Sequence, residues 1–454
     1  MSRPDGLTLA GLIARSGGAR RSLSTRDHVL PFQGFASGSP FGAQRSLFAG
    51  RSVALSVRDM AMAAAALIDL DGLARRILLC PPGWDAAKLG AAAKQSEADA
   101  LAYDEHGDAP GLSGAVSLPV RLPLASTGFK QTETLETEWV LPTSGTSGPP
   151  KLAVHTLRTL VGAIGSAPAQ EWATFYDIRR YGGLQIFLRA LAGQASLQLS
   201  GPDEPMENFL DRLGAAGVTH ISGTPTHWRK ALIADAASRI APSYIRLSGE
   251  IADDAVLQGL ASAFPRARIE HAYASTEAGV AFAVDDGRAG FPASWLDRHG
   301  PVLMRIVDGA LRVRTPRRAL RLLGADAPSL VDDEGYVDTG DMIERRGDRA
   351  YFVGRRGGII NVGGAKVHPE EVEAVLNGYG AVRASRVFAK SNPITGALVA
   401  AEIVLNDPTA PREGLERDII AFARRALPAH NAPARLRFVA DQPMTDAGKL
   451  SRHG

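Results

Sequence analysis

The densest set of groups that could do chemistry lies in residues 143–151, which read TSGTSGPPK. The hydroxyl groups and free backbone amides of such a run can surround anionic oxygens, and its glycines let the backbone approach a ligand closely. Lys151 adds a positive charge, so the composition predicts a phosphate-binding loop. The spacing differs from the P-loop of common nucleoside triphosphatases, because Leu152 follows the lysine. The alternative is a flexible surface loop.

Two further segments combine hydroxyl and acidic groups. In the segment YASTE at 273–277, Tyr273 could stack on a base and Glu277 could hold Mg²⁺, which prefers oxygen ligands. In the segment YVDTGD at 336–341, Asp341 follows a turn glycine and could accept two ribose hydroxyls. Taken alone, the first segment fits a helix cap better and the second fits an ordinary acidic turn.

The last part of the chain contributes glycines and a late lysine. The segment GRRGG at 354–358 is suited to a hinge, and Pro369 with the glutamates that follow it predicts the start of a helix. Near the end, Lys449 follows a turn glycine in the segment TDAGKL at 445–450. A lysine near a chain end is usually a solvated charge, so it carries little argument by itself.

Segments that alternate between strand and helix must position these groups. Expected strands lie at 53–57, 76–79, 218–221, 244–247 and 268–272, and expected helices lie at 61–73, 228–237 and 254–263. This alternation predicts an α/β fold with parallel sheets and crossover helices. Ligands of such sheets bind where the strands end and the following loops begin.

After Gly300 the pattern changes to short strands. Residues 303–307 and 310–314 flank Asp308-Gly309, which is a strong hairpin signal. A compact α+β stretch follows the glycines near 355. We therefore expect a large domain at 1–354, built of parallel-rich sheets, flanking helices and a small β-barrel-like part. A small mobile α+β domain is expected at 355–454.

Composition excludes several classes of protein. The 454 residues are 45% hydrophobic and 22% charged, which is ordinary for a globular protein with a large core. The formal charge of +3 gives no support for nucleic-acid binding. A single cysteine, Cys80, excludes an intrachain disulfide and a cysteine zinc site. We find no apolar run long enough to span a membrane and no secretory signal, so we expect a cytoplasmic enzyme.

In their order and spacing, these segments resemble the signatures of the adenylate-forming superfamily, which includes acyl- and aryl-CoA ligases, peptide-synthetase adenylation domains and luciferases. The resemblance covers about residues 45–454. The residues expected to enclose the β- and γ-phosphates of ATP are Thr143, Ser144, Gly145, Thr146, Ser147, Gly148 and Lys151. Those expected to line the adenine pocket are Gly249, Glu250, His271, Ala272 and Tyr273.

The resemblance also implies roles at the reacting centre. Thr276 would touch the α-phosphate, and Glu277 would bind Mg²⁺. Asp341 would bind the ribose with Arg355 nearby, and Lys449 would reach the reacting carboxylate. A carboxylate would attack the α-phosphate of ATP, and the thiol of CoA or of a carrier-protein phosphopantetheine would then displace AMP. Charge neutralisation and positioning supply most of the catalysis in such a reaction.

A rotation of the small domain between the two steps is also implied by the resemblance. It would remove Lys449 and present Gly363 and Gly364 to the thiol arm. Gly357 would stand at the hinge, where the family usually has Asp or Lys. Ala274 replaces the usual glycine after the tyrosine, which could crowd the nucleotide. No charged catalytic group is lost, so we expect an active enzyme.

For the acid, the resemblance points to residues 175–185. The candidate substrate-binding residues are Tyr176, Asp177, Gly182, Thr224 and Trp228. Asp177 could pair with the ammonium of an amino acid, and the alternative is a local pair with Arg179, Arg180 or the backbone. Trp228 fits an aromatic or medium-length acid, and the alternative is an ordinary core position.

Three functions stay open from the sequence. The leading one is an acid:CoA ligase. The second is a stand-alone adenylation enzyme that loads an aryl or amino acid onto a carrier protein in trans. The third is a degenerate, non-catalytic nucleotide-binding protein, against which the retention of Glu277, Asp341, Arg355 and Lys449 argues. The sequence leaves the acid and the oligomeric state undetermined.

Overall fold

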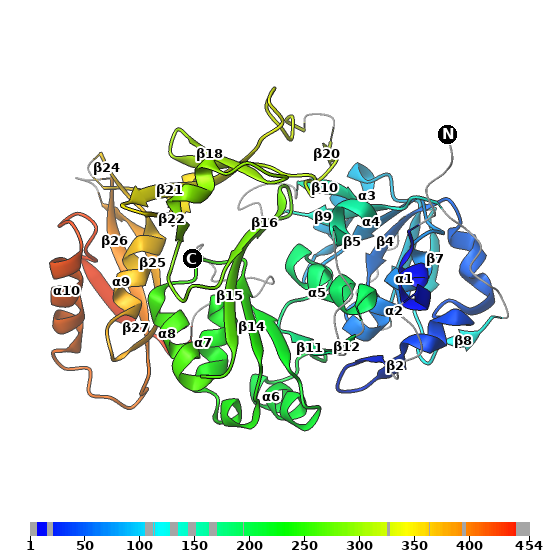
Figure 1. Cartoon of the computed structure of the whole chain (residues 1–454), viewed down its shortest axis with the longest axis horizontal. Helices are drawn as coiled ribbons and strands as arrows, with labels where there is room; N and C mark the ends of the chain where they lie inside the picture. Colours follow the sequence, from blue (N-terminus) through cyan, green and yellow to red (C-terminus); the bar gives the residue numbers. More distant parts are fainter. Residues whose placement is uncertain are drawn as a thin grey trace.

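The computed structural model describes residues 7–15, 21–104, 112, 114–127, 135–143, 151–162, 170–193, 195–324, 327–362, 364–392 and 396–441. Three large sheets make up most of the molecule, and some of their strands alternate along the chain (Figure 1). A smaller α+β part lies at one end, beside helices of the central sheet. The fold is therefore mixed α/β, with a small C-terminal part, as the sequence predicts.

The central sheet has eight strands and is mostly parallel. Its order is β16 (Gly279–Val284), β15 (Arg268–Ser275), β14 (Tyr244–Ser248), β13 (His220–Gly223), β11 (Gln170–Thr174), β12 (Ala195–Leu199), β1 (Ser22–Ser24) and β2 (Val29–Pro31). Only β2 and β16 at its edges run antiparallel to their neighbours.

Alternation along these strands gives the central sheet two distinct faces. Ile221 and Ile245 face α6 (Met206–Ala215), α7 (Pro225–Ile233) and α8 (Asp254–Ala263), in a cluster that also holds Trp228. Trp172 faces the other way and joins the cluster formed with α5 (Tyr181–Ala192). That larger cluster fills the space between the central sheet and the next sheet, and it includes α1 (Leu9–Arg15) and α2 (Met60–Leu70).

The second sheet has seven strands and carries the glycine-rich loop. Its order is β20 (Arg321–Leu323), β10 (Leu152–Thr156), β9 (Glu138–Pro142), β5 (Arg76–Leu79), β4 (Ser52–Ser56), β6 (Ala100–Tyr103) and β7 (Val116–Pro119). Strands β4 to β7 and β9 are parallel, whereas β9 and β10 form an antiparallel pair. The helices α3 (Ala86–Gln95) and α4 (Leu157–Val161) follow β5 and β10 in the chain.

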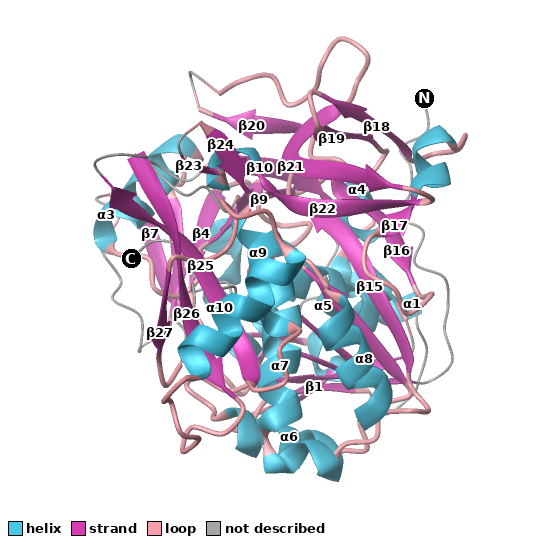
Figure 2. Ribbon diagram, turned by 90° about the vertical axis from the view of Figure 1, so that its left-hand side faces the viewer, coloured by secondary structure: helices cyan, strands magenta, loops and turns pink. Residues whose placement is uncertain are grey.

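The third sheet is antiparallel and lies across the top of the molecule in Figure 2, above α5, α7 and α8. Its order is β17 (Phe291–Pro292), β22 (Arg349–Arg355), β21 (Val337–Arg346), β19 (Ala310–Arg314) and β18 (Leu303–Val307). Asp308 and Gly309 form the predicted hairpin turn, and both have a positive φ. A two-stranded pair joins β3 (Gly38–Ser39) to β8 (Ala125–Ser126).

The C-terminal part has a core of its own. It comprises β23 (Ile360–Val362), β24 (Ala365–Val367), α9 (Pro369–Asn377), β25 (Val382–Asn392), β26 (Gly396–Leu405), α10 (Leu415–Ala426) and β27 (Arg435–Phe438). Its cluster of buried residues runs from Ile360 to Leu436 and takes no member from the sheets before it. An ion pair of 3.3 Å between Lys230 and Asp441 joins this part to α7. The helix predicted at Pro369 begins at that residue.

Among the described residues, no helix is both long enough and apolar enough to cross a membrane.

Candidate functional site

The predicted phosphate-binding loop lies at the tip of the β9–β10 hairpin. Pro142 pairs with Leu152 at the end of the hairpin, and the Thr143 amide donates to the Lys151 carbonyl over 2.8 Å. The strands below are buried, which holds the two ends of the loop together. Ser144, Gly145, Thr146, Ser147 and Gly148 lie outside the described residues. Thr143 is nearly buried and Lys151 is exposed.

A buried histidine connects this hairpin to the turn between β15 and β16. The ring of His155 in β10 donates from Nε2 to the Thr276 carbonyl over 2.7 Å, and Nδ1 lies 2.9 Å from the Thr159 hydroxyl. Burial lowers the pKa of His155 to about 4, so the ring is neutral at ordinary pH. The backbone of Thr276 is therefore held by the strand that follows the predicted phosphate-binding loop.

Asp341 is the centre of the polar contacts at this end of the central sheet. One of its carboxylate oxygens accepts from the Tyr273 hydroxyl over 2.5 Å, and the other accepts from Arg355 Nε over 2.8 Å. Burial and the adjacent Asp341 charge raise the pKa of Tyr273 well above its usual value. Burial opposes the charge of Arg355, but Asp341 outweighs it and raises the pKa of the guanidinium. Glu277 also contributes to that electrostatic attraction.

The ring of Tyr273 belongs to an aromatic cluster. It stacks on Phe352 of β22, with the ring centroids 4.8 Å apart and the planes at 15°, and Phe282 of β16 lies 5.6 Å away. Gly340, with its positive φ, lies next to Asp341 at an irregularity in the pairing of β21 with β19. Strands from two sheets thus position Tyr273, Asp341 and Arg355, which the sequence expected to find together.

The other residues expected around adenine lie on neighbouring strand ends. Gly249 follows β14 with a φ of +85°, and Glu250 accepts a hydrogen bond from the Thr226 amide over 3.0 Å. His271 donates to the Arg288 carbonyl over 3.0 Å, and Ala272 is buried. Glu250 is thus bound to the first turn of α7, and His271 to the loop after β16.

The candidate acid pocket starts at Tyr176, between β11 and α5. The hydroxyl of Tyr176 donates to the Ser248 carbonyl over 2.6 Å, and an added Cβ at Gly182 would lie 3.6 Å from the Tyr176 ring. Burial raises the pKa of Tyr176 well above its usual value, so the hydroxyl stays protonated. Tyr176, Gly182 and Ser248 therefore form one wall on the α5 face of the central sheet.

Asp177 is paired with Arg179, which is one of the alternatives that the sequence left open. Its two oxygens accept 2.7 Å bonds from Nε and from a terminal nitrogen of Arg179, and the Arg179 amide adds a third at 2.8 Å. Burial opposes ionisation of Asp177, but Arg179 lowers the pKa of the carboxyl overall. Arg179 in turn donates to the backbone carbonyls of Val57 and Arg58. Asp177 therefore fixes the loop before α5, and the structure gives no support to a role in binding an ammonium.

The expectation that Trp228 and Thr224 form a wall of the acid pocket needs correction. Trp228 is fully buried in the cluster between α7, α8 and the sheet, on the opposite face from Tyr176. Thr224 is also fully buried and caps α7 by accepting from the His227 amide over 3.0 Å. Trp228 packs on the α7 and α8 side of the central sheet, and the Thr224 hydroxyl is used by the helix cap.

The predicted hinge region follows the end of β22. Gly354 has a φ of +143°, and a side chain there would collide with Glu370. Gly357 is exposed, and an added Cβ would meet nothing within 4 Å, so no steric need for glycine arises there. Gly364 is exposed with a φ of +89°. Gly363 and Lys449 lie outside the described residues.

Sequence reasoning missed two residues of this site. His155 contacts Thr276, and Phe352 contacts Tyr273. A lone histidine in an apolar strand next to the predicted phosphate-binding loop was an available signal for the first. Phe352 is far from Tyr273 in the chain, so only the folded structure reveals their contact.

Comparisons with known proteins match most of the chain. The model of the family described as AMP-binding enzyme matches residues 81–314, and that of the AMP-binding enzyme C-terminal domain matches residues 371–449. The mitochondrial acyl-coenzyme A synthetase ACSM4 of Rattus norvegicus is 28% identical over 367 residues, which cover 71% of this chain and 61% of the relative. The chain thus aligns with less than two thirds of that relative.

Two other similarities are to a part of a curated relative and to a solved structure. The medium/long-chain-fatty-acid–[acyl-carrier-protein] ligase FadD10 of Mycobacterium tuberculosis is 32% identical over 151 residues, covering 32% of this chain and 27% of the relative. The structure of the anthranilate CoA ligase AuaEII, in complex with anthranoyl-AMP, superposes with a TM-score of 0.80 at 18% identity. That superposition covers 99% of this chain and 96% of the other, and it shows that the fold is shared.

Proposed function

Because the chain belongs to the AMP-binding enzyme family, we propose that it is an ATP-dependent ligase that activates a carboxylic acid as its adenylate and transfers the acyl group to the thiol of CoA. The observation that carries this proposal is the arrangement around Asp341. A carboxylate held by Tyr273 and Arg355 keeps lone pairs for the ribose hydroxyls, at the strand ends where nucleotides bind in α/β folds.

The proposed reaction needs opposite charges more than covalent help from the protein. An oxygen of the acid attacks the α-phosphorus of ATP, the bond from that phosphorus to the bridging oxygen breaks, and pyrophosphate leaves. Lys151 and Lys449 are the lysines that would neutralise the phosphates and the incoming carboxylate. The thiolate of CoA then attacks the acyl carbon, and AMP leaves with the electron pair.

Glu277 is the residue that would hold Mg²⁺, together with phosphate oxygens. The described residues include no group of three or more potential metal ligands, so the protein by itself offers one carboxylate and the nucleotide would supply the remaining oxygens. When bound there, Mg²⁺ would neutralise phosphate charge. Arg355 is attracted electrostatically by the same carboxylate, which supports a role for Glu277 beside the Asp341 cluster.

The test is the acid-dependent exchange of labelled pyrophosphate into ATP, measured over a panel of aryl, acyl and amino acids. We expect exchange with at least one acid, and AMP release when CoA is added. ATP binding without exchange for any acid would favour the non-catalytic nucleotide-binding protein instead.

A carrier protein is the second candidate for the thiol. The similarity to an acyl-carrier-protein ligase over 151 residues favours it. Free CoA and a phosphopantetheine-bearing carrier protein should be compared as acceptors of the same adenylate. We expect CoA to stimulate AMP release more strongly, and the opposite order would assign the carrier.

We also propose that the large domain spans 1–354 and the small domain spans 355–454. The separate core between Ile360 and Leu436 supports this boundary. Gly357 and the adjacent residues would act as the hinge, and Gly363 and Gly364 would face the thiol in the second step.

A further inference from the structure

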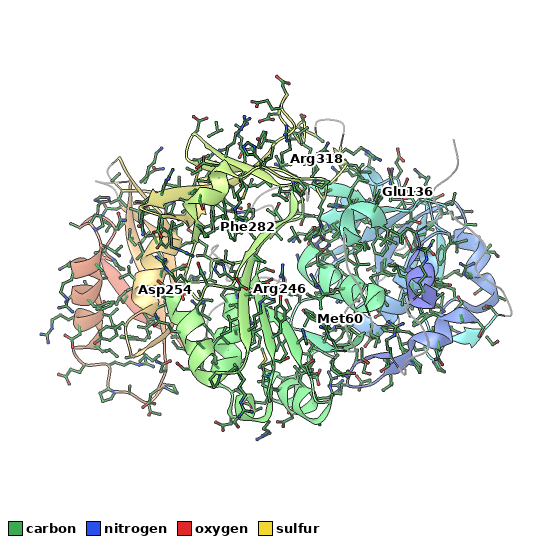
Figure 3. All side chains as sticks on the ribbon, viewed as in Figure 1. Met60, Glu136, Arg246, Asp254, Phe282 and Arg318 are labelled. Carbon is green, nitrogen blue, oxygen red and sulfur yellow. The ribbon has the colours of Figure 1, made fainter. Side chains whose placement is uncertain are left out.

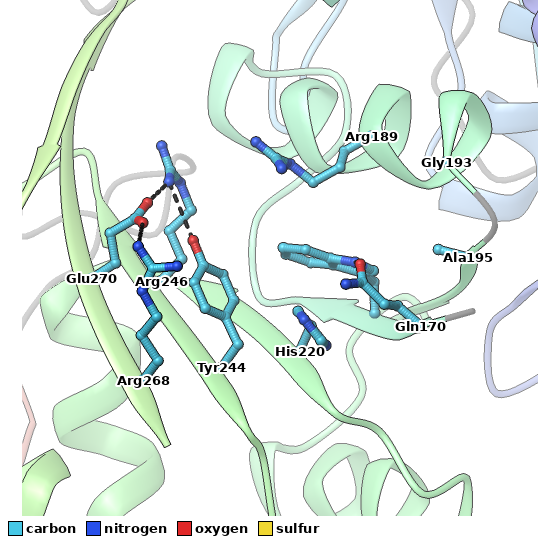
Figure 4. Close-up of a pocket in the computed structure, with 10 residues that line it drawn as sticks. Gln170, Arg189, Gly193, Ala195, His220, Tyr244, Arg246, Arg268 and Glu270 are labelled. Atoms are coloured by element: carbon cyan, nitrogen blue, oxygen red, sulfur yellow. Dashed lines mark hydrogen bonds and ion pairs between the residues drawn. The ribbon is translucent and has the colours of Figure 1, made fainter. Parts of the chain in front are cut away.

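A polar cavity that the proposed reaction does not use lies between α5 and the amino-terminal halves of strands β11 to β15. Its volume is about 280 Å³, and Trp172, His220 and Tyr244 line the side of the cavity that the sheet forms. Figure 4 shows Arg189 of α5 above these rings, and Arg246 and Glu270 at the end of the cavity. These side chains share the α5 face of the sheet with Ser248. The cavity and the candidate acid pocket therefore both lie between α5 and the central sheet, a region that we call the α5 seam.

The strand register orders the side chains along this seam. Thr174, Ser222, Arg246 and Glu270 are paired across four neighbouring strands and form one row. Ser248 and Ala272 form the next row toward the nucleotide site. Two residues along a strand span roughly 6.5 Å. The row of Arg246 therefore lies roughly 6.5 Å from the row of Ser248, on the side away from the nucleotide site. Ser248 contacts Tyr176, at which the candidate acid pocket begins.

The side chains in the row of Arg246 are polar, and its last two members form an ion pair. Arg246 donates to Glu270, and the two side chains are only 12% and 10% exposed. Ser222 is 1% exposed, and its hydroxyl has no hydrogen-bond partner among the described residues. The Tyr176 hydroxyl and Arg246 interact electrostatically, in agreement with the position of Arg246 one row from Ser248. In Figure 3, Arg246 lies near the centre of the molecule.

We propose that the buried Arg246–Glu270 pair is the floor of the acid pocket and restricts the substrate to compact acids, aryl or short-chain, while excluding long-chain fatty acids. This inference rests on the proposed function. A long alkyl chain would have to separate two charges that are shielded from water, and its methylenes would then meet only polar groups. A compact acid ends above the row and leaves the pair intact.

The experiment compares acids in the pyrophosphate exchange assay with the full-length protein. Benzoate, hexanoate and dodecanoate serve as substrates. We expect the kcat/KM for dodecanoate to be at least about 100-fold below that of the best compact acid. Equal use of dodecanoate and the compact acids would overturn the inference. If no acid supports exchange, the proposed function itself is contradicted, and the inference about the floor with it. That result differs from equal use of all acids, which contradicts the inference alone.

A double variant tests the residues themselves. Arg246→Leu combined with Glu270→Leu removes both charges together, so neither is left unpaired, and it joins the acid pocket to the cavity beyond. We expect the ratio of dodecanoate to benzoate activity to rise at least about tenfold. The matched control is Arg239→Leu with Asp211→Leu, which removes an exposed ion pair at α6, on the face of the central sheet opposite to α5.

A folded double variant with an unchanged ratio would also overturn the inference. Thermal unfolding establishes whether the variant is folded. If the variant is unfolded, the inference is tested by the acid preference of the wild-type protein alone.

Discussion

At the scale of single residues, Asp341 is the acceptor that joins Tyr273 and Arg355 in the candidate site. Replacing it with Asn keeps the shape but removes the charge that Tyr273 and Arg355 share. Loss of a charge-assisted hydrogen bond costs about 1.5–3 kcal/mol, so we expect the KM for ATP to rise roughly 10- to 100-fold. Pyrophosphate exchange at varied ATP measures it. Glu344→Gln, on the same strand but paired with Arg346, should leave the KM unchanged.

Asp177 shows how a residue type can mislead when its partner is unknown. It was a candidate for binding an ammonium, but the structure pairs it with Arg179, whose side chain is 3% exposed. Breaking a buried pair from one side costs roughly 3–5 kcal/mol, so Asp177→Asn should lower the free energy of unfolding by about that amount. Urea denaturation measures the change. A variant of normal stability that loses activity only toward amino acids would restore the ammonium role.

His155 predicts a pH dependence of stability. Its pKa falls from 6.5 to about 4 on folding, because burial disfavours the charged ring. Between these two pH values the unfolded chain binds a proton that the native protein does not, so stability rises with pH. The contribution is complete above pH 6.5 and is lost progressively as the pH falls toward 4.

The His155→Gln variant isolates that contribution. Its free energy of unfolding should depend less on pH in this range, by up to about 3 kcal/mol. Urea denaturation of both proteins at pH 5 and pH 7 gives the comparison. Parallel pH profiles for the two proteins would show that the buried ring does not titrate on unfolding.

At the scale of elements, the start of α5 depends on one glycine. An added Cβ at Gly183 would collide with the Asp177 carbonyl, whereas one at Gly182 would lie 3.6 Å from the Tyr176 ring, an ordinary contact. We expect Gly183→Ala to lower the melting temperature by several degrees, for a cost of about 1–3 kcal/mol. Gly182→Ala is the matched control and should have little effect on melting. Equal effects would mean that the loop before α5 adapts.

Most elements could be predicted from local pattern. The strands at Arg76–Leu79, Leu303–Val307 and Ala310–Arg314 and the helix Asp254–Ala263 lie where the sequence put them. The expected helix at 228–237 instead begins at Pro225 and ends at Ile233, because Thr224 caps it and Pro225 starts it. Caps of this kind depend on side-chain contacts that hydrophobic periodicity does not record.

At the scale of the whole molecule, the proposed two-step reaction requires two arrangements of the domains. Lys449→Ala should reduce adenylate formation by about 100- to 1,000-fold, by comparison with the loss of a transition-state donor. Thioester formation from a supplied acyl-adenylate should be spared, because the lysine would have left the site by then. Separate assays of the two half-reactions measure this. Equal losses in both steps would contradict the domain rotation.

The sequence alone determined the types of groups that could handle a nucleotide and the order in which they occur. The phosphate loop, Glu277, Asp341 and the hairpin at Asp308-Gly309 are local patterns, and local patterns depend on neighbours in the chain. For the same reason, the α/β alternation was sufficient to predict the fold class.

Only the tertiary structure decided which faces these residues occupy and which partners they take. Trp228, which was expected from the sequence to line the acid pocket, lies in a hydrophobic core. Arg246 and Glu270 form an ion pair in the α5 seam. Both outcomes depend on strand register and on contacts between residues 24 or more positions apart. A one-residue shift in register would turn each side chain to the other face of the sheet, so no local pattern could fix them.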